Sequence, residues 1–243
     1  AIMPVHIYGR MCDMEKIMNL AYQYNLWVIE DAAESHGAVF KGKKAGAWGD
    51  MGCFSLFANK IITSGEGGLV TTSDERLYKQ LKHLNRMAFD PGHTFFHPKK
   101  AYNFVMNNVT AAVGLAQVEK IDDILAKREQ IRGWYDEYLG QYTIKRPPGS
   151  VMWMYDIVLP EGISNVKVAD QLLERGIESR LFFKPMGSQP PFGGKWYALN
   201  AHKFSARGLY LPTYLDLTQE DVSYISQEVI NTINVYKSPT NMV

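Results

Sequence analysis

The stretch that decides the fold is Leu26-Trp27-Val28-Ile29-Glu30-Asp31. A run of apolar residues that ends in two acidic ones is typical of a short buried strand in a parallel sheet, because such strands are covered on both faces. Before it, residues 14–24 carry apolar side chains at helical spacing, with Asp13 as the N-cap. Residues 1–9 form another apolar segment, which ends at a glycine. The order strand, helix, strand predicts a βαβ unit with Asp31 at the carboxyl end of a strand.

The first half of the chain continues this α/β pattern. Short apolar runs predict strands at residues 53–57 and 68–72, and Ser73 is the expected N-cap of a helix over residues 74–86. Residues 107–140 are expected to be mostly helical. We therefore predict a large α/β domain with a mainly parallel sheet and connecting helices, over residues 1–145.

The segment Arg146-Pro-Pro-Gly-Ser150 marks the expected domain boundary, because proline and glycine interrupt regular structure. Beyond it, the pattern predicts strands at residues 151–159 and 177–183 and helices at residues 166–175 and 218–236, the last capped by Thr218. These elements predict a smaller α+β domain over residues 146–243.

Composition excludes several classes of function. The 243 residues include 26 basic and 25 acidic ones, so the formal net charge of +1 gives no electrostatic basis for binding nucleic acid or a membrane surface. Cys12 and Cys53 form no CxxC pair and no cluster with histidine, which argues against a disulfide scaffold and a metal site. No apolar run reaches the length of a membrane span. We expect a cytoplasmic protein whose partner is a small molecule.

Three side chains of the first half form a candidate catalytic group. Asp31 and Ser55 lie at the ends of predicted strands, and Lys60 precedes the glycine-rich segment 64–68. In an open α/β sheet, ligands bind at the carboxyl ends of the strands, so these groups are expected to converge. Pyridoxal phosphate (PLP) enzymes need a lysine for the cofactor aldehyde, a carboxylate for the pyridine nitrogen and donors for the phosphate. Lys60, Asp31 and Ser55 supply these three types.

Longer motifs around these residues carry a resemblance to a known family. They are Val-Ile-Glu-Asp-Ala-Ala-Glu-Ser-His-Gly-Ala at residues 28–38, Gly-Asp-Met-Gly-Cys-Phe-Ser-Leu-Phe-Ala-Asn-Lys at residues 49–60, and Gly-Glu-Gly-Gly at residues 65–68. Together they resemble the core signature of the DegT/StrS sugar aminotransferases. The resemblance implies a PLP enzyme with the aspartate-aminotransferase-like fold (fold type I). Chains of that family have a further segment before the part that matches, so we expect the large domain to be incomplete at its N-terminus.

The resemblance assigns roles residue by residue. Lys60 is the lysine that binds the cofactor aldehyde and moves the proton, and Asp31 is the partner of the pyridinium nitrogen. Ser55 donates to the phosphate, and Glu34 lies against the cofactor ring or its phenolic oxygen. Asn103 matches an asparagine that reaches the cofactor phosphate of the neighbouring subunit, which implies a homodimer with a shared active site.

Within the family, residues 85–90 and 102–107 look closest to the GDP-perosamine synthase branch. That branch aminates C4 of a GDP-linked 4-keto-6-deoxymannose with nitrogen from L-glutamate, which leaves 2-oxoglutarate. The resemblance thus implies L-glutamate and a nucleotide-linked keto-sugar as ligands. Arg180, His93 and His97 are the further candidates for substrate binding.

Two departures from the family pattern keep an alternative open. Val105 occupies a position where arginine is common, and Gly187 one where histidine is common. These changes are compatible with a catalytically impaired or non-catalytic PLP-binding relative. Trp153 alternates with other apolar residues on a predicted strand and is expected to belong to the core.

Overall fold

The computed structural model describes residues 1–92, 95–194 and 198–237. The chain forms two compact units: the first comprises residues 1–125 and 147–153, and the second comprises residues 126–146 and the chain from residue 154 onward. Helix α4 (Ile121–Leu139) runs from the first unit into the second. The division therefore assigns much of α4 to the second unit and returns residues 147–153 to the first, whereas the sequence places a single boundary after residue 145.

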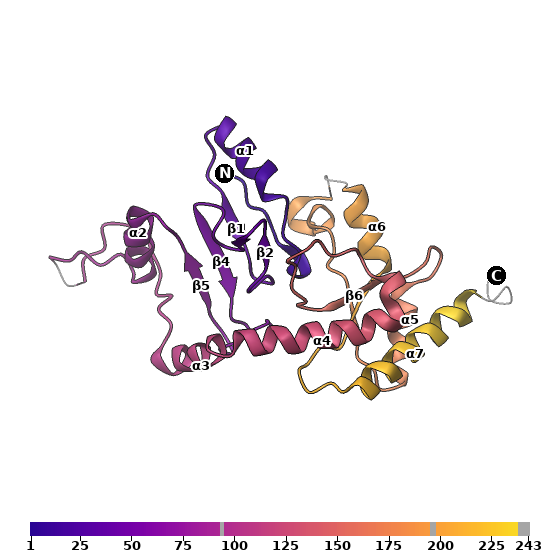
Figure 1. Ribbon diagram of the computed structural model, residues 1–243. Coiled ribbons are helices and arrows are strands. Elements are labelled where there is room, and N and C mark those ends of the chain that lie inside the picture. Colours follow the sequence, from indigo (N-terminus) through magenta and orange to yellow (C-terminus); the bar gives the residue numbers. More distant parts are fainter. Residues whose placement is uncertain (93–94, 195–197, 238–243) are drawn as a thin grey trace. The chain divides into compact units, whose positions relative to one another are not determined.

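The first unit contains a three-stranded sheet in the order β1-β4-β5 (Figure 1). Strand β1 (Ile29–Asp31) pairs in parallel with β4 (Met51–Ser55), and β5 (Gly68–Thr71) runs antiparallel to β4. The opening segment adds isolated parallel bridges at Ile2 and Val5 on the other side of β1. The expected parallel pairing is thus present in a mixed sheet, and β5 is its antiparallel edge.

Strand β1 begins three residues later than the apolar run. The N–H of Leu26 donates to the carbonyl of Ala21, 2.8 Å away, and so closes the end of helix α1 (Met14–Gln23). Asn25, in the left-handed region at φ 50°, makes this turn. Leu26 and Trp27 consequently remain exposed, and only Val28 of the run is fully buried before β1.

The helices of the first unit begin at polar caps. The Asp13 carboxylate accepts the N–H of Lys16 at the start of α1, as the sequence predicts. At α2 (Glu75–Asn85) the N-cap is Asp74, whose carboxylate accepts two backbone N–H groups. The prediction of Ser73 as cap was therefore wrong by one residue. The remaining elements of this unit are η1 (Ile7–Gly9), the hairpin of β2 (Val39–Phe40) and β3 (Lys43–Lys44), and α3 (Asn108–Val118).

The second unit has an antiparallel sheet in the order β6-β8-β7. Its strands are β6 (Tyr155–Val158), β8 (Gly208–Leu211) and β7 (Arg180–Leu181), and helices α5 (Asn165–Glu174) and α7 (Gln219–Lys237) pack on each other. Thr218 caps α7 as expected, because its hydroxyl accepts the N–H of Asp221 while the Asp221 carboxylate accepts the N–H of Thr218. The sequence pattern did not predict β8 or α6 (Leu199–Arg207).

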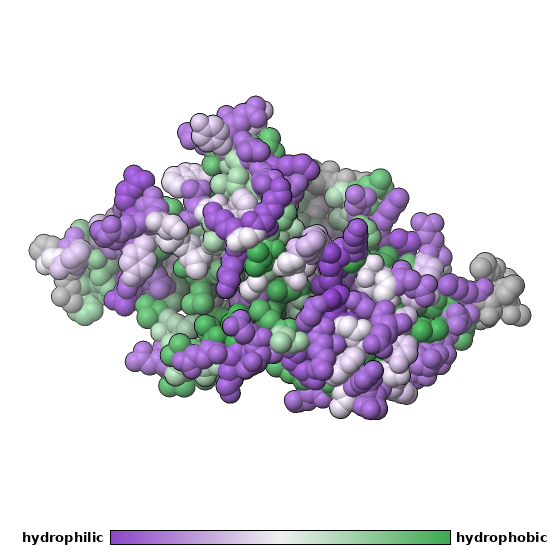
Figure 2. Space-filling model, viewed as in Figure 1, coloured by the Kyte–Doolittle hydropathy of each residue, from purple (hydrophilic) through white to green (hydrophobic). Residues whose placement is uncertain are grey.

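Apolar side chains also lie on the surface. Within the described part of the chain, α3 buries only Gly114, and Figure 2 shows apolar residues, in green, gathered where α3 lies in Figure 1. The large apolar residues of α3 that stay exposed are Val109, Val113, Leu115 and Val118. Among the residues that the structure describes, no helix is both long enough and apolar enough to cross a membrane.

Candidate active site

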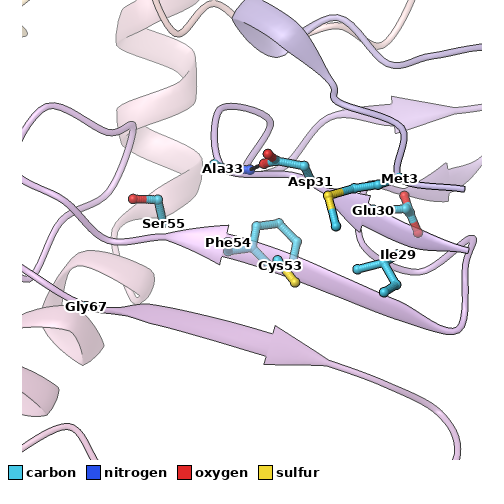
Figure 3. A pocket seen from close by; sticks show the side chains of 9 residues that line it. All are labelled: Met3, Ile29, Glu30, Asp31, Ala33, Cys53, Phe54, Ser55 and Gly67. Carbon is cyan, nitrogen blue, oxygen red and sulfur yellow. Dashed lines mark hydrogen bonds between the residues drawn. The ribbon is translucent and has the colours of Figure 1, made fainter. Parts of the chain in front are cut away.

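A pocket opens at the carboxyl ends of β1 and β4. Because these strands are parallel, their last residues lie at the same edge of the sheet, and Figure 3 shows the Asp31 carboxylate and the Ser55 hydroxyl at that edge. The pocket has a volume of about 310 Å³. Its lining residues are Met3, Ile29, Glu30, Asp31, Ala33, Cys53, Phe54, Ser55 and Gly67. The structure therefore brings two of the predicted site residues into one pocket.

Backbone hydrogen bonds hold Asp31 in place. Its N–H donates to the carbonyl of Pro4 at 2.9 Å, and its carbonyl accepts the N–H of His6 at 3.0 Å. One carboxylate oxygen accepts the N–H of Ala33 at 3.1 Å, which turns the chain away from the sheet. These hydrogen bonds to Pro4, His6 and Ala33 fix the direction in which the carboxylate points at the pocket.

Ser55 ends β4 two residues beyond Cys53, the residue that lies opposite Asp31 in the parallel register. Its hydroxyl oxygen accepts the N–H of Phe57 at 3.2 Å, and its backbone pairs with Gly68 of β5. The hydroxyl keeps its proton for another acceptor, because a hydroxyl group both accepts and donates.

Lys60 and Glu34 form a pair with low solvent exposure. The Lys60 Nζ atom lies 3.4 Å from Glu34 Oε1, and the Lys60 side chain is only 13% exposed. The other oxygen, Oε2, accepts the backbone N–H of Tyr8 at 2.8 Å. Lys60 Nζ also lies 4.2 Å from the centroid of the Trp153 ring.

Burial raises the pKa of the Glu34 carboxyl above its ordinary value. The N–H of Tyr8 and the positive charge of Lys60 pull this pKa down, and the nearby charge of Asp31 pushes it up, so the net direction is upward. A carboxyl with a raised pKa beside an amine at the end of parallel strands is the kind of group that marks a functional site.

The neighbouring carboxylate, Glu30, behaves in the opposite way. Burial alone raises its pKa, but hydrogen bonds from His6, Gly49, Gly46 and Trp48 outweigh that effect and hold the pKa of Glu30 below its ordinary value. Its Oε1 accepts from Trp48 and Gly49, and its Oε2 from His6 and Gly46. Glu30 is therefore an ionised anchor for the 46–49 turn, although part of it lines the pocket.

The other predicted site residues lie elsewhere. Asn103 is exposed and forms an isolated antiparallel β-bridge with Arg86. Its side-chain oxygen accepts the N–H of Val105 at 3.4 Å. His97 is exposed, with Nδ1 2.6 Å from the carbonyl oxygen of Met87. His93 lies outside the described residues. Arg180 is exposed in the second unit, where it pairs with Glu178 at 3.1 Å. The pocket lining includes none of these three described residues, and it does not include Lys60 or Glu34.

Two contributors to this site were not predicted from the sequence. Tyr8 supplies the backbone N–H that binds Glu34, and Trp153 supplies the ring beneath Lys60. Trp153 is buried as expected, at 2% exposure, but residues 151–153 form no strand. The only sequence signal was the indole N–H, which needs an acceptor when buried and finds it in the carbonyl of Asn59 at 2.7 Å.

Comparison with known proteins identifies the family. The sequence pattern of the DegT/DnrJ/EryC1/StrS aminotransferase family matches residues 1–230. The chain belongs to this family. It is 42% identical over 238 residues to the GDP-perosamine synthase of Caulobacter vibrioides, a match that covers 93% of this chain and 64% of that protein. A second relative, from Bacillus subtilis, bears a name that describes it as a pyridoxal phosphate-dependent aminotransferase; it is 31% identical, with 98% of this chain and 65% of that protein covered.

The fold agrees with this membership. The Helicobacter pylori aminotransferase PseC, involved in the biosynthesis of pseudoaminic acid, superposes with a TM-score of 0.89 and 25% identity over 97% of this chain and 67% of that one. Fold type I is thereby confirmed. The chain spans 64% of the length of the Caulobacter relative.

Proposed function

We propose that this chain carries the PLP site of an aminotransferase that moves an amino group from L-glutamate to a nucleotide-linked 4-keto-6-deoxy sugar. The observation that carries the proposal is the position of Lys60. Its amine is largely withdrawn from solvent next to Glu34, in the same unit as the pocket lined by Asp31 and Ser55. A lysine amine is the side-chain nucleophile that combines with a carbonyl group such as the cofactor aldehyde.

The side chains present fit PLP in their chemistry. When bound, this cofactor supplies an aldehyde that takes up an amino group and a protonated ring that withdraws electrons from the reacting carbon. Lys60 is the residue to bind the aldehyde, and the Asp31 carboxylate is the acceptor for the ring N–H. The Ser55 hydroxyl is a donor for the phosphate. Glu34 lies beside Lys60 and would face the ring or its phenolic oxygen.

Three side chains of the protein have separate roles in proton transfer. Lys60 would be the base that takes a proton from the amino-acid substrate and the acid that delivers it to the cofactor. The Asp31 carboxylate would accept the N–H of the ring and so keep the proton on the ring nitrogen. Glu34 holds the amine in place by an ion pair and a hydrogen bond. The overall reaction balances as L-glutamate plus keto-sugar giving 2-oxoglutarate plus amino-sugar.

The finer assignments rest on similarity. The 42% identity to a GDP-perosamine synthase supports a GDP-linked 4-keto-6-deoxymannose as the sugar. A homodimer, in which Asn103 reaches the partner's cofactor phosphate, is supported by the exposed apolar residues Val109, Val113 and Leu115 of α3. Arg180, His93 and His97 remain predicted substrate contacts, and a cytoplasmic location remains a prediction.

The visible absorbance of the protein with PLP, before and after L-glutamate, tests the proposal. We expect a band from lysine-bound PLP that disappears as 2-oxoglutarate forms. Lys60→Ala should abolish this behaviour, while the matched variant Lys44→Ala, which removes an exposed lysine of the same unit, should preserve it. A band that ignores L-glutamate would indicate a PLP-binding relative without the activity, and no band from folded protein would refute the PLP site.

A further inference from the structure

We propose that Trp153 is a positioning residue for Lys60, and that the Tyr8-Gly9 turn holds Trp153 and Glu34 on two sides of the lysine amine. The assignment of the amine's catalytic use rests on the function proposed above. The positioning itself rests on contacts within the first unit, to which all these residues belong.

The first contact is between the lysine and the indole. Lys60 Nζ lies 4.2 Å from the centroid of the Trp153 ring, well inside the range of a cation–π interaction. Trp153 is 2% exposed and the Lys60 side chain 13% exposed, so little water competes for the ammonium group. Tryptophan offers the most favourable ring face for a cation, and desolvation strengthens the attraction.

The indole is itself held in place. Its N–H donates to the carbonyl of Asn59, the residue that precedes Lys60, at 2.7 Å. Its other neighbour is the ring of Tyr8, whose centroid lies 6.1 Å away at an interplanar angle of 18°. The ring therefore has a fixed relation both to the backbone that carries Lys60 and to the opening segment of the chain.

Tyr8 adopts a backbone conformation that bulky residues rarely occupy, with φ 54° and ψ 27°. In this conformation its N–H donates to Glu34 Oε2 at 2.8 Å, while Oε1 of the same carboxylate contacts Lys60. Strain of this kind persists only where the surroundings hold it, and it is frequent at functional sites.

Gly9 completes the arrangement. Its φ is 81°, and a Cβ atom there would lie 2.1 Å from the carbonyl oxygen of Val151. The N–H of Val151 donates to the Gly9 carbonyl at 3.1 Å, which ties the segment that carries Trp153 to the Tyr8-Gly9 turn. The contacts thus close a ring from Lys60 to Trp153, Tyr8, Glu34 and back to Lys60.

This ring gives the lysine amine a defined resting place. The carboxylate of Glu34 and the face of Trp153 contact the amine and hold it in one position. In the proposed reaction Lys60 leaves the cofactor aldehyde and binds it again in each turnover. A fixed position of the free amine favours this return. Removing the ring face should therefore lower kcat more than it changes KM for L-glutamate.

The direct test measures the reactivity of Lys60 without PLP. We compare Trp153→Leu, which removes the π face, with Trp153→Phe, which keeps a smaller one, by site-resolved acylation and peptide mass spectrometry. Acylation requires the amine to leave its contacts with Trp153 and Glu34, so we expect Trp153→Leu to label Lys60 about five to ten times faster than the wild type, with Trp153→Phe between them. Lys44, which is exposed, provides the internal reference in every sample.

Each result decides the matter. Labelling of Lys60 that is no faster in Trp153→Leu than in the wild type would overturn the proposal. Equal acceleration in Trp153→Leu and Trp153→Phe would also overturn it, because the π face that phenylalanine keeps would then make no difference. Circular dichroism and the unchanged labelling of Lys44 report that each variant is folded. Because the assay contains no PLP, failure of the absorbance test above would refute the aminotransferase and leave this result standing.

Discussion

Two buried carboxylates four residues apart, Glu30 and Glu34, are expected to respond in opposite ways to the same substitution. Each is replaced by glutamine, which keeps the shape and removes the charge. Both lie in the first unit, so the same unfolding transition reports on both. The prediction separates an anchor of the fold from a residue kept for chemistry.

The magnitude for Glu30 follows from its hydrogen bonds. Its two oxygens accept from Trp48 at 2.6 Å, Gly49 at 2.8 Å, Gly46 at 2.9 Å and His6 at 3.0 Å. Whichever oxygen becomes an amide NH₂ group then faces two donors, and each buried donor left unpaired costs about 1–3 kcal/mol. We expect Glu30→Gln to lower the free energy of unfolding by about 3–5 kcal/mol at neutral pH.

Glu34→Gln is expected to change this free energy by less than about 1 kcal/mol, or to raise it. The amide oxygen of glutamine can still accept the N–H of Tyr8, and Lys60 keeps its contact with Trp153. The substitution also removes a carboxylate whose ionised form the fold disfavours, as the raised pKa of Glu34 shows.

The two effects have opposite pH dependence. The pKa of Glu30 in the fold lies below its ordinary 4.5, so its stabilisation is present above that pH and is lost as the pH falls through the folded pKa. The pKa of Glu34 lies above its ordinary 4.5, so its ionised form costs stability as the pH rises from that value through the folded pKa. Glu30→Gln should therefore do less harm in acid, and any gain from Glu34→Gln should vanish there.

Urea unfolding followed by circular dichroism measures both variants and the wild type at about pH 7 and at about pH 3, well below the ordinary pKa of a glutamate. The reasoning would be refuted by a Glu34→Gln loss at neutral pH as large as that of Glu30→Gln. It would equally be refuted if the loss from Glu30→Gln grew on acidification.

Three further substitutions test separate parts of the account. Gly9→Ala should lower the free energy of unfolding by about 3 kcal/mol or more, and Gly42→Ala by only about 1–2 kcal/mol. Both glycines have φ 81°, but only at Gly9 would a Cβ atom meet the Val151 carbonyl. Equal losses in denaturation curves would contradict this close approach. Asn165→Ala should cost about 2–4 kcal/mol by the same assay, since the buried Asn165 amide donates to two backbone carbonyls at 3.0 and 3.1 Å, and a loss under about 1 kcal/mol would argue against those bonds. Asp31→Ala should still bind PLP in equilibrium dialysis yet lose most of the turnover, and a rate near that of the wild type would remove the role assigned to Asp31.

The sequence is sufficient for those site residues whose positions follow from strand ends. Asp31 and Ser55 end neighbouring parallel strands and both line the pocket. Glu34 was assigned only by the resemblance to the family, and the structure places it in contact with Lys60. Strand ends and parallel pairing are local features, which is why the sequence predicts that Asp31 and Ser55 lie at one edge of the sheet.

Long-range contacts could not be predicted in this way. Trp153 meets Lys60 across 93 residues of chain, as the difference of their numbers shows, and no local pattern encodes that approach. Leu26 and Trp27 have the composition of a strand, but the left-handed turn at Asn25 leaves them on the surface. Strand β8 was missed because its few apolar residues look like a strand only next to β6 and β7.

The central claim is that Lys60 is the lysine that binds PLP. The most direct measurement is to treat the PLP-loaded protein with sodium borohydride, which makes the lysine–cofactor link permanent, and to map the modified peptide by mass spectrometry. The account predicts one phosphopyridoxyl group, on Lys60. Modification of a different lysine, or none in folded protein that has been saturated with PLP, would contradict it.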